Sequence, residues 1–134
     1  MLPIFEDLVA AALLRAGLPF DDYVTLQDGE KERVHCDLVI PNRYAPKAII
    51  LAKPFDAFED CMDSFLDTVT EMGKFKEKYG LDFFVVTDGI GWKIRTKDLQ
   101  RLVDLQNAGV VDMIFTLRTL DELTEFVRDA CNGF

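Results

Sequence analysis

The stretch from Val34 to Lys53, VHCDLVIPNRYAPKAIILAK, carries the pattern from which the fold can be predicted. Two apolar runs rich in β-branched residues stand on either side of a turn that Pro41 and Pro46 bracket. Such runs, separated by turn-forming residues, predict two neighbouring strands. Asp37 lies inside the first run and Lys53 ends the second, so paired strands would carry one acid and one base.

The order of residues within the two runs predicts how each strand is buried, because side chains alternate between the two faces of a strand. In the first run, 32–40, one face carries Val34, Cys36, Leu38 and Ile40, and the other carries His35, Asp37 and Val39. In the second run, 47–53, one face carries Ile49, Leu51 and Lys53, and the other carries Ala48, Ile50 and Ala52. Apolar residues on both faces are typical of a central strand that is covered on both sides.

Signals for helices and strands continue in both directions from this stretch. They predict helices at 3–16, 55–79, 97–108 and 120–130, and further strands at 20–27, 81–87 and 110–116. Gly17, Gly80 and Gly109 stand where the first three helices should end, and Thr119 stands at the expected N-cap of the last. The longest helix carries an apolar stripe at helical spacing: Phe55, Phe58, Met62, Phe65, Val69, Met72 and Tyr79.

The predicted order of elements is α-β-β-β-α-β-α-β-α. An antiparallel opening followed by strands that alternate with helices implies an α/β fold with a single mixed sheet flanked by helices. The length of 134 residues is that of one domain, so we expect residues 1–134 to form a single unit.

Composition narrows the classes of function. The formal net charge of −9 disfavours DNA as a partner and fits a protein partner that carries a basic patch. We expect a protein partner or a homo-oligomer. The candidate DNA contact is a basic cluster, and a solvated surface explains it equally well; its members are Lys93, Arg95, Lys97 and Arg101. Three widely spaced cysteines suit reduced thiols in a cytoplasmic protein, and no apolar run approaches the roughly 20 residues of a membrane span.

The chain resembles the PD-(D/E)xK nuclease superfamily, which includes many type II restriction endonucleases. The resemblance covers roughly residues 3–92 and rests on the order of elements and three local features. Asp37 falls in the second strand, Lys53 ends the third, and the fourth runs into VVTDGIGW at 85–92, a string similar to segments of several restriction-enzyme domains.

This resemblance implies hydrolysis of a DNA phosphodiester with Mg²⁺ as the cofactor. Asp37 would be the first metal ligand and Lys53 the catalytic lysine. The motif places a second acid two residues before the lysine, and that position is Leu51. A leucine provides no oxygen for Mg²⁺, a cation that takes oxygen ligands. The chain therefore departs from the family at the metal site itself.

Two other acids are candidates for the missing ligand, because some family members recruit one from a neighbouring helix. Asp67 follows Lys53 by fourteen residues, but at about 100° per residue it points away from the apolar stripe, as a solvated acid would. Glu6 lies in the first turn of the first helix, where an acid also favours the helix dipole. His35, the only histidine, would contact a phosphate or metal, or hydrogen-bond a neighbour.

Three functional hypotheses follow from these residues. The first is an endonuclease-like domain that is active or degenerate. The second is a nuclease fold without catalysis, acting as an interaction module through a protein partner. The third is an unrelated α/β domain in which Asp37 and Lys53 form an ion pair across two strands.

Overall fold

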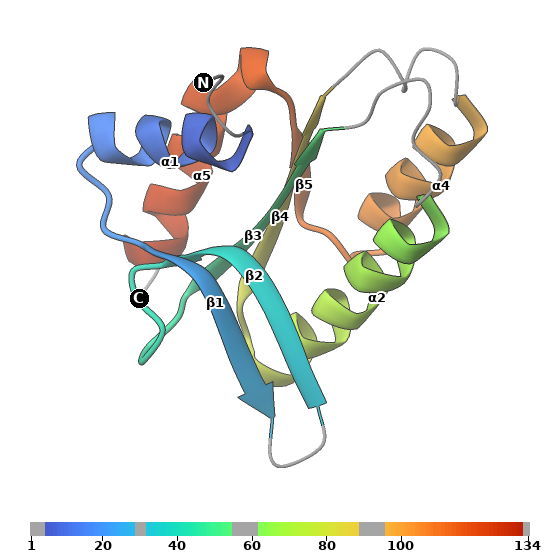
Figure 1. The fold of residues 1–134 in the computed structure, drawn as a ribbon, viewed down its shortest axis with the longest axis horizontal. Coiled ribbons are helices and arrows are strands. Elements are labelled where there is room, and N and C mark those ends of the chain that lie inside the picture. Colours follow the sequence, from blue (N-terminus) through green and yellow to red (C-terminus); the bar gives the residue numbers. More distant parts are fainter. Residues whose placement is uncertain (1–4, 29–31, 55–61, 89–95, 133–134) are drawn as a thin grey trace.

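The computed structural model describes residues 5–28, 32–54, 62–88 and 96–132 (Figure 1). Its elements are α1 (Phe5–Arg15), β1 (Asp21–Asp28), β2 (Glu32–Ile40), β3 (Ala48–Pro54), α2 (Met62–Tyr79), β4 (Asp82–Asp88), α4 (Thr96–Asn107), β5 (Met113–Phe115), the 3₁₀ helix η1 (Leu117–Thr119) and α5 (Leu120–Asn132). This order confirms the predicted α/β class. The expected start of the longest helix, 55–61, lies outside the described residues.

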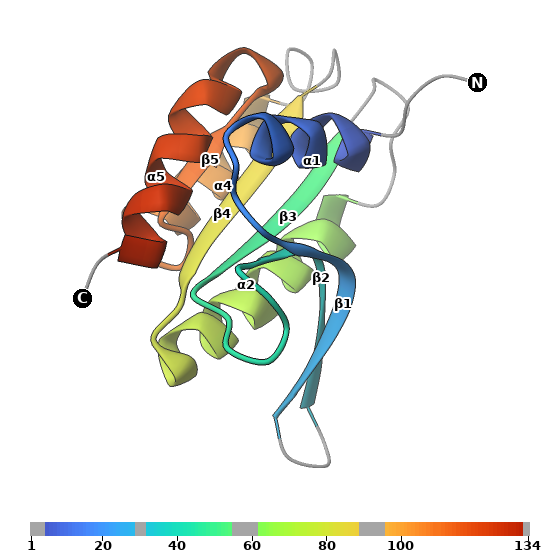
Figure 2. The same cartoon turned by 90° about the vertical axis from the view of Figure 1, so that its left-hand side faces the viewer.

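The five strands form one mixed sheet in the order β1-β2-β3-β4-β5. The pairs β1–β2 and β2–β3 are antiparallel, whereas β3–β4 and β4–β5 are parallel. Helices α1 and α5 cover one face of this sheet, and α2 and α4 cover the other (Figure 1). Seen from the side, α1 and α5 lie in front of the strands, and the β1–β2 hairpin projects beyond them (Figure 2).

The core has one half on each face of the sheet, and the central strand β3 contributes to both. Ile49 and Leu51 pack on the face covered by α2, and Ala48, Ile50 and Ala52 pack on the face covered by α1 and α5. This confirms the predicted central position of the strand. Each fully buried aliphatic side chain stabilises the fold by about 1.5–3 kcal/mol. Because β3 buries such side chains on both of its faces, its position in the sheet is firmly fixed.

The apolar stripe of α2 follows the prediction through its middle and departs from it at the end. Phe65, Val69 and Met72 are buried, but Tyr79 is 47% exposed. Phe75, which the stripe did not include, is buried instead, and its ring centroid lies 4.6 Å from that of Tyr79. The last turn of α2 borders an open cavity, so Tyr79 covers Phe75 from the solvent side.

The end of the chain also differs from the prediction. The strand expected at 110–116 is confined to Met113–Phe115, because the chain bends at Asp112. The Asp112 carboxylate accepts hydrogen bonds from the Phe83 amide (2.7 Å) and the Lys76 ammonium group (3.0 Å). The predicted N-cap at Thr119 is wrong. Thr116 begins η1, accepting the Arg118 amide, and η1 continues directly into α5.

Three helix ends match the sequence. Gly17, Gly80 and Gly109 have φ values of 73°, 65° and 82°, a left-handed conformation that glycine adopts without a steric penalty. Among the helices of the described residues, none combines the length and hydropathy required to cross a membrane.

Candidate functional site

The candidate site lies where β2 separates from β3. The two strands pair only from Leu38 to Ile40, opposite Ile50 to Ala48. The β1–β2 pairing continues further, but it is interrupted between Tyr23 and Asp37, and Tyr23 has a φ of 51°. The hairpin therefore bends away from the sheet at these two residues.

This bend changes which face of β2 each side chain occupies. Val34 and Cys36 pack on the α2 face together with Val39, whereas Leu38 packs on the α1 and α5 face. The expected placement of Val34, Cys36, Leu38 and Ile40 on a single face is therefore wrong. A regular strand alternates at every residue, and the alternation is broken between Cys36 and Leu38.

Asp37 lies at the break, partly buried, and its carboxylate replaces part of the strand pairing. Its Oδ2 accepts a hydrogen bond of 2.7 Å from the backbone amide of Ala52 on β3, at a point that β2 no longer reaches. Burial raises the pKa of Asp37, and the Ala52 amide opposes that rise. The charge of Glu6 raises the same pKa further, whereas the charge of Lys53 lowers it.

Glu6 brings a second carboxylate to this place from helix α1. Its Oε2 atom is buried and has no hydrogen-bond partner among the described residues. A buried carboxylate oxygen is costly unless a proton, a donor or a cation compensates it. Glu6 and Asp37 thus form a pair of interacting acids from two elements, and the described part of the chain provides no donor for the Oε2 of Glu6.

Lys53 completes a group of three residues drawn from α1, β2 and β3. Its backbone carbonyl accepts a hydrogen bond of 2.8 Å from the Thr87 hydroxyl, which ties the end of β3 to β4. Its positive charge acts on the Asp37 carboxylate. The group lies towards the carboxyl ends of the parallel strands β3 and β4, where open α/β sheets commonly bind ligands.

Tyr23 is a neighbour of these acids that the sequence did not reveal. Tyr23 is 61% exposed. The pKa of its phenol is raised, first by reduced hydration and then by the negative charges of Glu6, Asp7, Asp22 and Asp37. Its left-handed backbone had no signal in the sequence, since such a conformation is expected of glycine or asparagine.

The position of the missing motif acid is occupied by Leu51, which makes this side of the site apolar. Leu51 is 9% exposed and packs in the core beneath α2. Leu51 and Lys53 line a cavity of about 200 Å³ together with Ser64, Phe65 and Thr68 of α2. Within the described residues, no group of three or more His, Cys, Asp or Glu side chains is arranged to hold a metal ion. Among the described residues, Glu6 and Asp37 are the two carboxylates of the group that could bind a metal.

The remaining candidates lie elsewhere. Asp67 is exposed on α2 and is not among the charges that shift the pKa of Asp37. His35 is exposed, and its Nδ1 lies 2.8 Å from the Thr25 hydroxyl on β1. Lys97 is exposed at the start of α4. Arg101, another member of the basic cluster, is paired with Asp63 and Asp98. The remaining two members, Lys93 and Arg95, lie outside the described residues.

Comparison of the chain with family models, curated proteins and solved structures found no match. A functional assignment therefore depends on the residues of the site.

Proposed function

We propose that the chain is a restriction-endonuclease-like domain with a reduced Mg²⁺ site, in which Glu6 takes the place of the acid missing at Leu51. The observation that carries this proposal is the buried Oε2 of Glu6, which has no hydrogen-bond partner among the described residues and whose carboxylate charge acts on Asp37. The order of elements is compatible with such a domain, since β2 and β3 carry Asp37 and Lys53 as the motif requires.

The donors suit the cation. Carboxylate oxygens are the ligands that Mg²⁺ prefers, and a cation would offset the repulsion by which Glu6 raises the pKa of Asp37. Bound Mg²⁺ would supply a polarised phosphate and a water of lowered pKa. In this proposal Glu6 and Asp37 hold the cation, and Lys53 positions the phosphate or the attacking water.

A second candidate is a nuclease fold without catalysis that acts as an interaction module. Three observations favour it. Leu51 makes the wall of the site apolar, and the bond from Asp37 to the Ala52 amide gives this acid a structural reason to be present. The net charge of −9 also disfavours a DNA substrate.

Metal titration separates the two candidates. Mg²⁺ and Mn²⁺ are titrated calorimetrically into the wild type, Glu6→Gln, Asp37→Ala and the control Asp67→Asn, and cleavage of plasmid DNA is followed in parallel. We expect the first two substitutions to weaken binding by about tenfold or more and Asp67→Asn to leave it unchanged. Metal binding without cleavage would favour the interaction module. No metal binding by the wild type would overturn the proposed site.

Restoring the motif gives a second test. The cavity beside Leu51 offers space for a longer polar side chain, so Leu51→Glu should fold and add a third carboxylate. We expect it to bind Mg²⁺ about tenfold more tightly than the wild type and to show higher plasmid cleavage. Leu51→Gln is the matched control, with nearly the same shape and no charge. Equal metal affinity of the two folded variants would contradict the placement of residue 51 beside the cation.

A further inference from the structure

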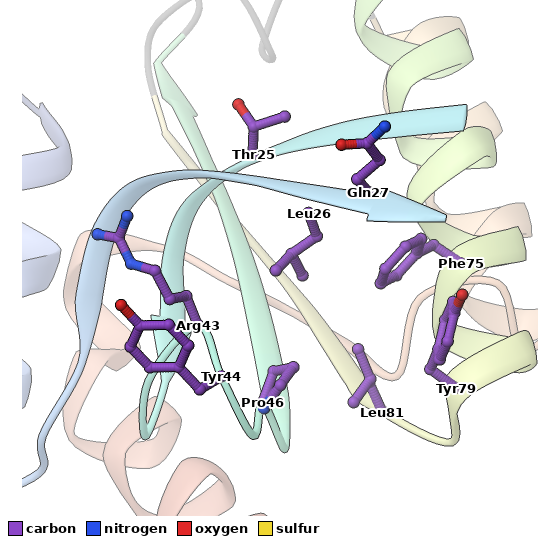
Figure 3. Close-up of a pocket in the computed structure, with 9 residues that line it drawn as sticks. All are labelled: Thr25, Leu26, Gln27, Arg43, Tyr44, Pro46, Phe75, Tyr79 and Leu81. Atoms are coloured by element: carbon purple, nitrogen blue, oxygen red, sulfur yellow. The ribbon is translucent and has the colours of Figure 1, made fainter. Parts of the chain in front are cut away.

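A second region of interest is a cavity on the far side of the β1–β2 hairpin from the acids of the candidate site. It has a volume of about 490 Å³ and is built from β1, the turn between β2 and β3, and the end of α2. Its lining residues are Thr25, Leu26, Gln27, Arg43, Tyr44, Pro46, Phe75, Tyr79 and Leu81 (Figure 3). None of them belongs to the group formed by Glu6, Asp37 and Lys53.

The walls of this cavity are more apolar than polar and are partly aromatic. Leu26 points into it from β1, and Phe75 and Leu81 face Leu26 from the other side (Figure 3). Tyr79 and Tyr44 border the opening and are 47% and 89% exposed. A volume of this size accommodates a large apolar side chain, and exposed tyrosines are typical of recognition surfaces.

Three consecutive residues of one strand line the cavity, which identifies the backbone edge of β1 as part of its wall. Side chains alternate along a strand, and those of Thr25 and Gln27 lie on the opposite side of β1 from Leu26 (Figure 3). β1 is the terminal strand of the sheet, and among the described strands it pairs with β2 alone. A terminal strand presents amide and carbonyl groups that can pair with an added strand.

Charge indicates what kind of strand would bind. By sequence, β1 begins with Asp21 and Asp22 and ends with Asp28, and the chain carries a net charge of −9. The lining cation, Arg43, is held by Asp21, with its Nε 3.4 Å from the carboxylate. Antiparallel pairing of β1 with a second copy, centred on Thr25, would place Asp22 opposite Asp28. Like charges opposite one another destabilise strand pairs, so a second copy is disfavoured.

We propose that the edge of β1 binds an extended, basic segment of a partner protein. The added strand pairs with the backbone of residues 24–27, one apolar side chain fills the cavity, and flanking lysine or arginine residues face the acids of β1. Main-chain bonds provide affinity in this mode of recognition, and the cavity provides selectivity. The proposal goes beyond the metal site and uses none of its residues.

The probe is a fluorescent seven-residue peptide of alternating lysine and valine with phenylalanine at its centre. Binding is followed by anisotropy at about 0.15 M salt, where exposed charges more than about 8 Å apart are largely screened. We expect saturable binding, a loss of at least tenfold in affinity for Tyr79→Ser, and a smaller loss for Asp22→Asn. The control Leu14→Ser, an exposed apolar residue of α1, should bind as the wild type does.

Two further peptides test the mode of binding. The same peptide with alternate backbone nitrogens methylated should not bind, because it cannot complete the strand pairing. A peptide with glutamate in place of lysine should bind at least tenfold more weakly. Equal binding of the methylated peptide, insensitivity to Tyr79→Ser, or a concentration-dependent dimer that excludes the peptide would each overturn the proposal.

Discussion

Asp37 serves the fold and the candidate site with the same carboxylate. It accepts the Ala52 amide where β2 has left β3, and it is partly buried beside Glu6. The backbone bond needs only an oxygen acceptor, whereas a cation site needs a negative charge. These two requirements can be separated by replacing the acid with its amide.

The pH dependence of stability should reveal this separation. The pKa of Asp37 is raised above 3.8 in the folded state, so the native state binds the proton more tightly than the unfolded chain. Stability therefore falls as pH rises from about 3.8 through the folded-state pKa, and the loss persists above it. Asp37→Asn, which keeps an acceptor for Ala52, should be at least as stable as the wild type at neutral pH.

Urea denaturation of both proteins between about pH 3 and pH 8 measures this difference, because titrating groups that do not interact with Asp37 contribute equally to the two. We expect the two free energies of unfolding to converge at the acidic end. A variant that is less stable than the wild type at neutral pH, and matches it only in acid, would indicate that the attraction between the charges of Asp37 and Lys53 outweighs the cost of burial.

Gly73 shows a second residue whose role is set by packing. It is buried in α2, and an added Cβ would collide with the side chain of Val110 and lie 3.1 Å from the Val110 carbonyl oxygen. Helix propensity alone would make Gly73→Ala favourable by about 1 kcal/mol. The stiff valine and the backbone oxygen reverse that sign, so we expect a net destabilisation of about 1–3 kcal/mol.

Urea denaturation of Gly73→Ala tests this expectation, with Glu77→Ala as a control at an exposed position of the same helix. The control should stay within about 0.5 kcal/mol of the wild type. If Gly73→Ala proved more stable than the wild type, α2 would not be held against residues 109–110 as closely as described.

At the scale of elements, the β1–β2 hairpin is the part whose geometry the sequence predicted least well. The lengths of both strands were predicted to within one or two residues, because alternation and turn residues are local signals. The break at Tyr23 and Asp37 was not predicted. It lies where the hairpin bends, and the apolar side chains of the hairpin join the same core cluster as Leu66 and Phe75 of α2. Strand bending of this kind depends on the tertiary structure and not on the local pattern.

Substitution at Tyr23 tests whether the bend is strained. A non-glycine residue in the left-handed region costs of order 1 kcal/mol, and this side chain is 61% exposed, so little packing is lost when it is removed. We therefore expect Tyr23→Gly to raise the free energy of unfolding by about 0.5–1 kcal/mol.

The matched control is Thr25→Gly, two residues along β1 and exposed in regular strand geometry. There, glycine should destabilise by about 0.5–1 kcal/mol, because it adds entropy to the unfolded chain without relieving strain. Thermal denaturation of the two variants gives both signs in one experiment. The same sign for both substitutions would contradict a bend centred on Tyr23.

At the scale of the whole molecule, the class of fold and the central position of β3 were predictable, because they follow from long apolar runs and their spacing. The convergence of Glu6 on Asp37 was not, although Glu6 was a candidate. Its position depends on how α1 packs on the sheet, and α1 packs mainly against β3 and α5, which lie far from it in sequence. Local sequence patterns do not encode contacts between elements that are so far apart in the chain.

The net charge of −9 has a consequence for the stability of the whole molecule. Repulsion among 24 acidic residues, with 15 basic ones to offset them, destabilises the compact state at neutral pH. We expect the Tm to rise by several degrees as NaCl increases from about 0.02 to 0.5 M, because salt screens the repulsion. Exposed ion pairs are screened as well, but each contributes only about 0–1 kcal/mol. A Tm that falls with NaCl would show that these pairs outweigh the repulsion.

The bond between Asp37 and Ala52 also bears on how such a domain would change over evolutionary time. Selection for folding alone would retain an acceptor at residue 37 after any catalytic activity had been lost. An aspartate there is therefore a poor record of past or present activity in descendants of the same ancestor. The side chain of residue 51 makes no hydrogen bond to the backbone, because it is a leucine. Its identity would therefore follow the loss or return of activity far more closely than the identity of residue 37.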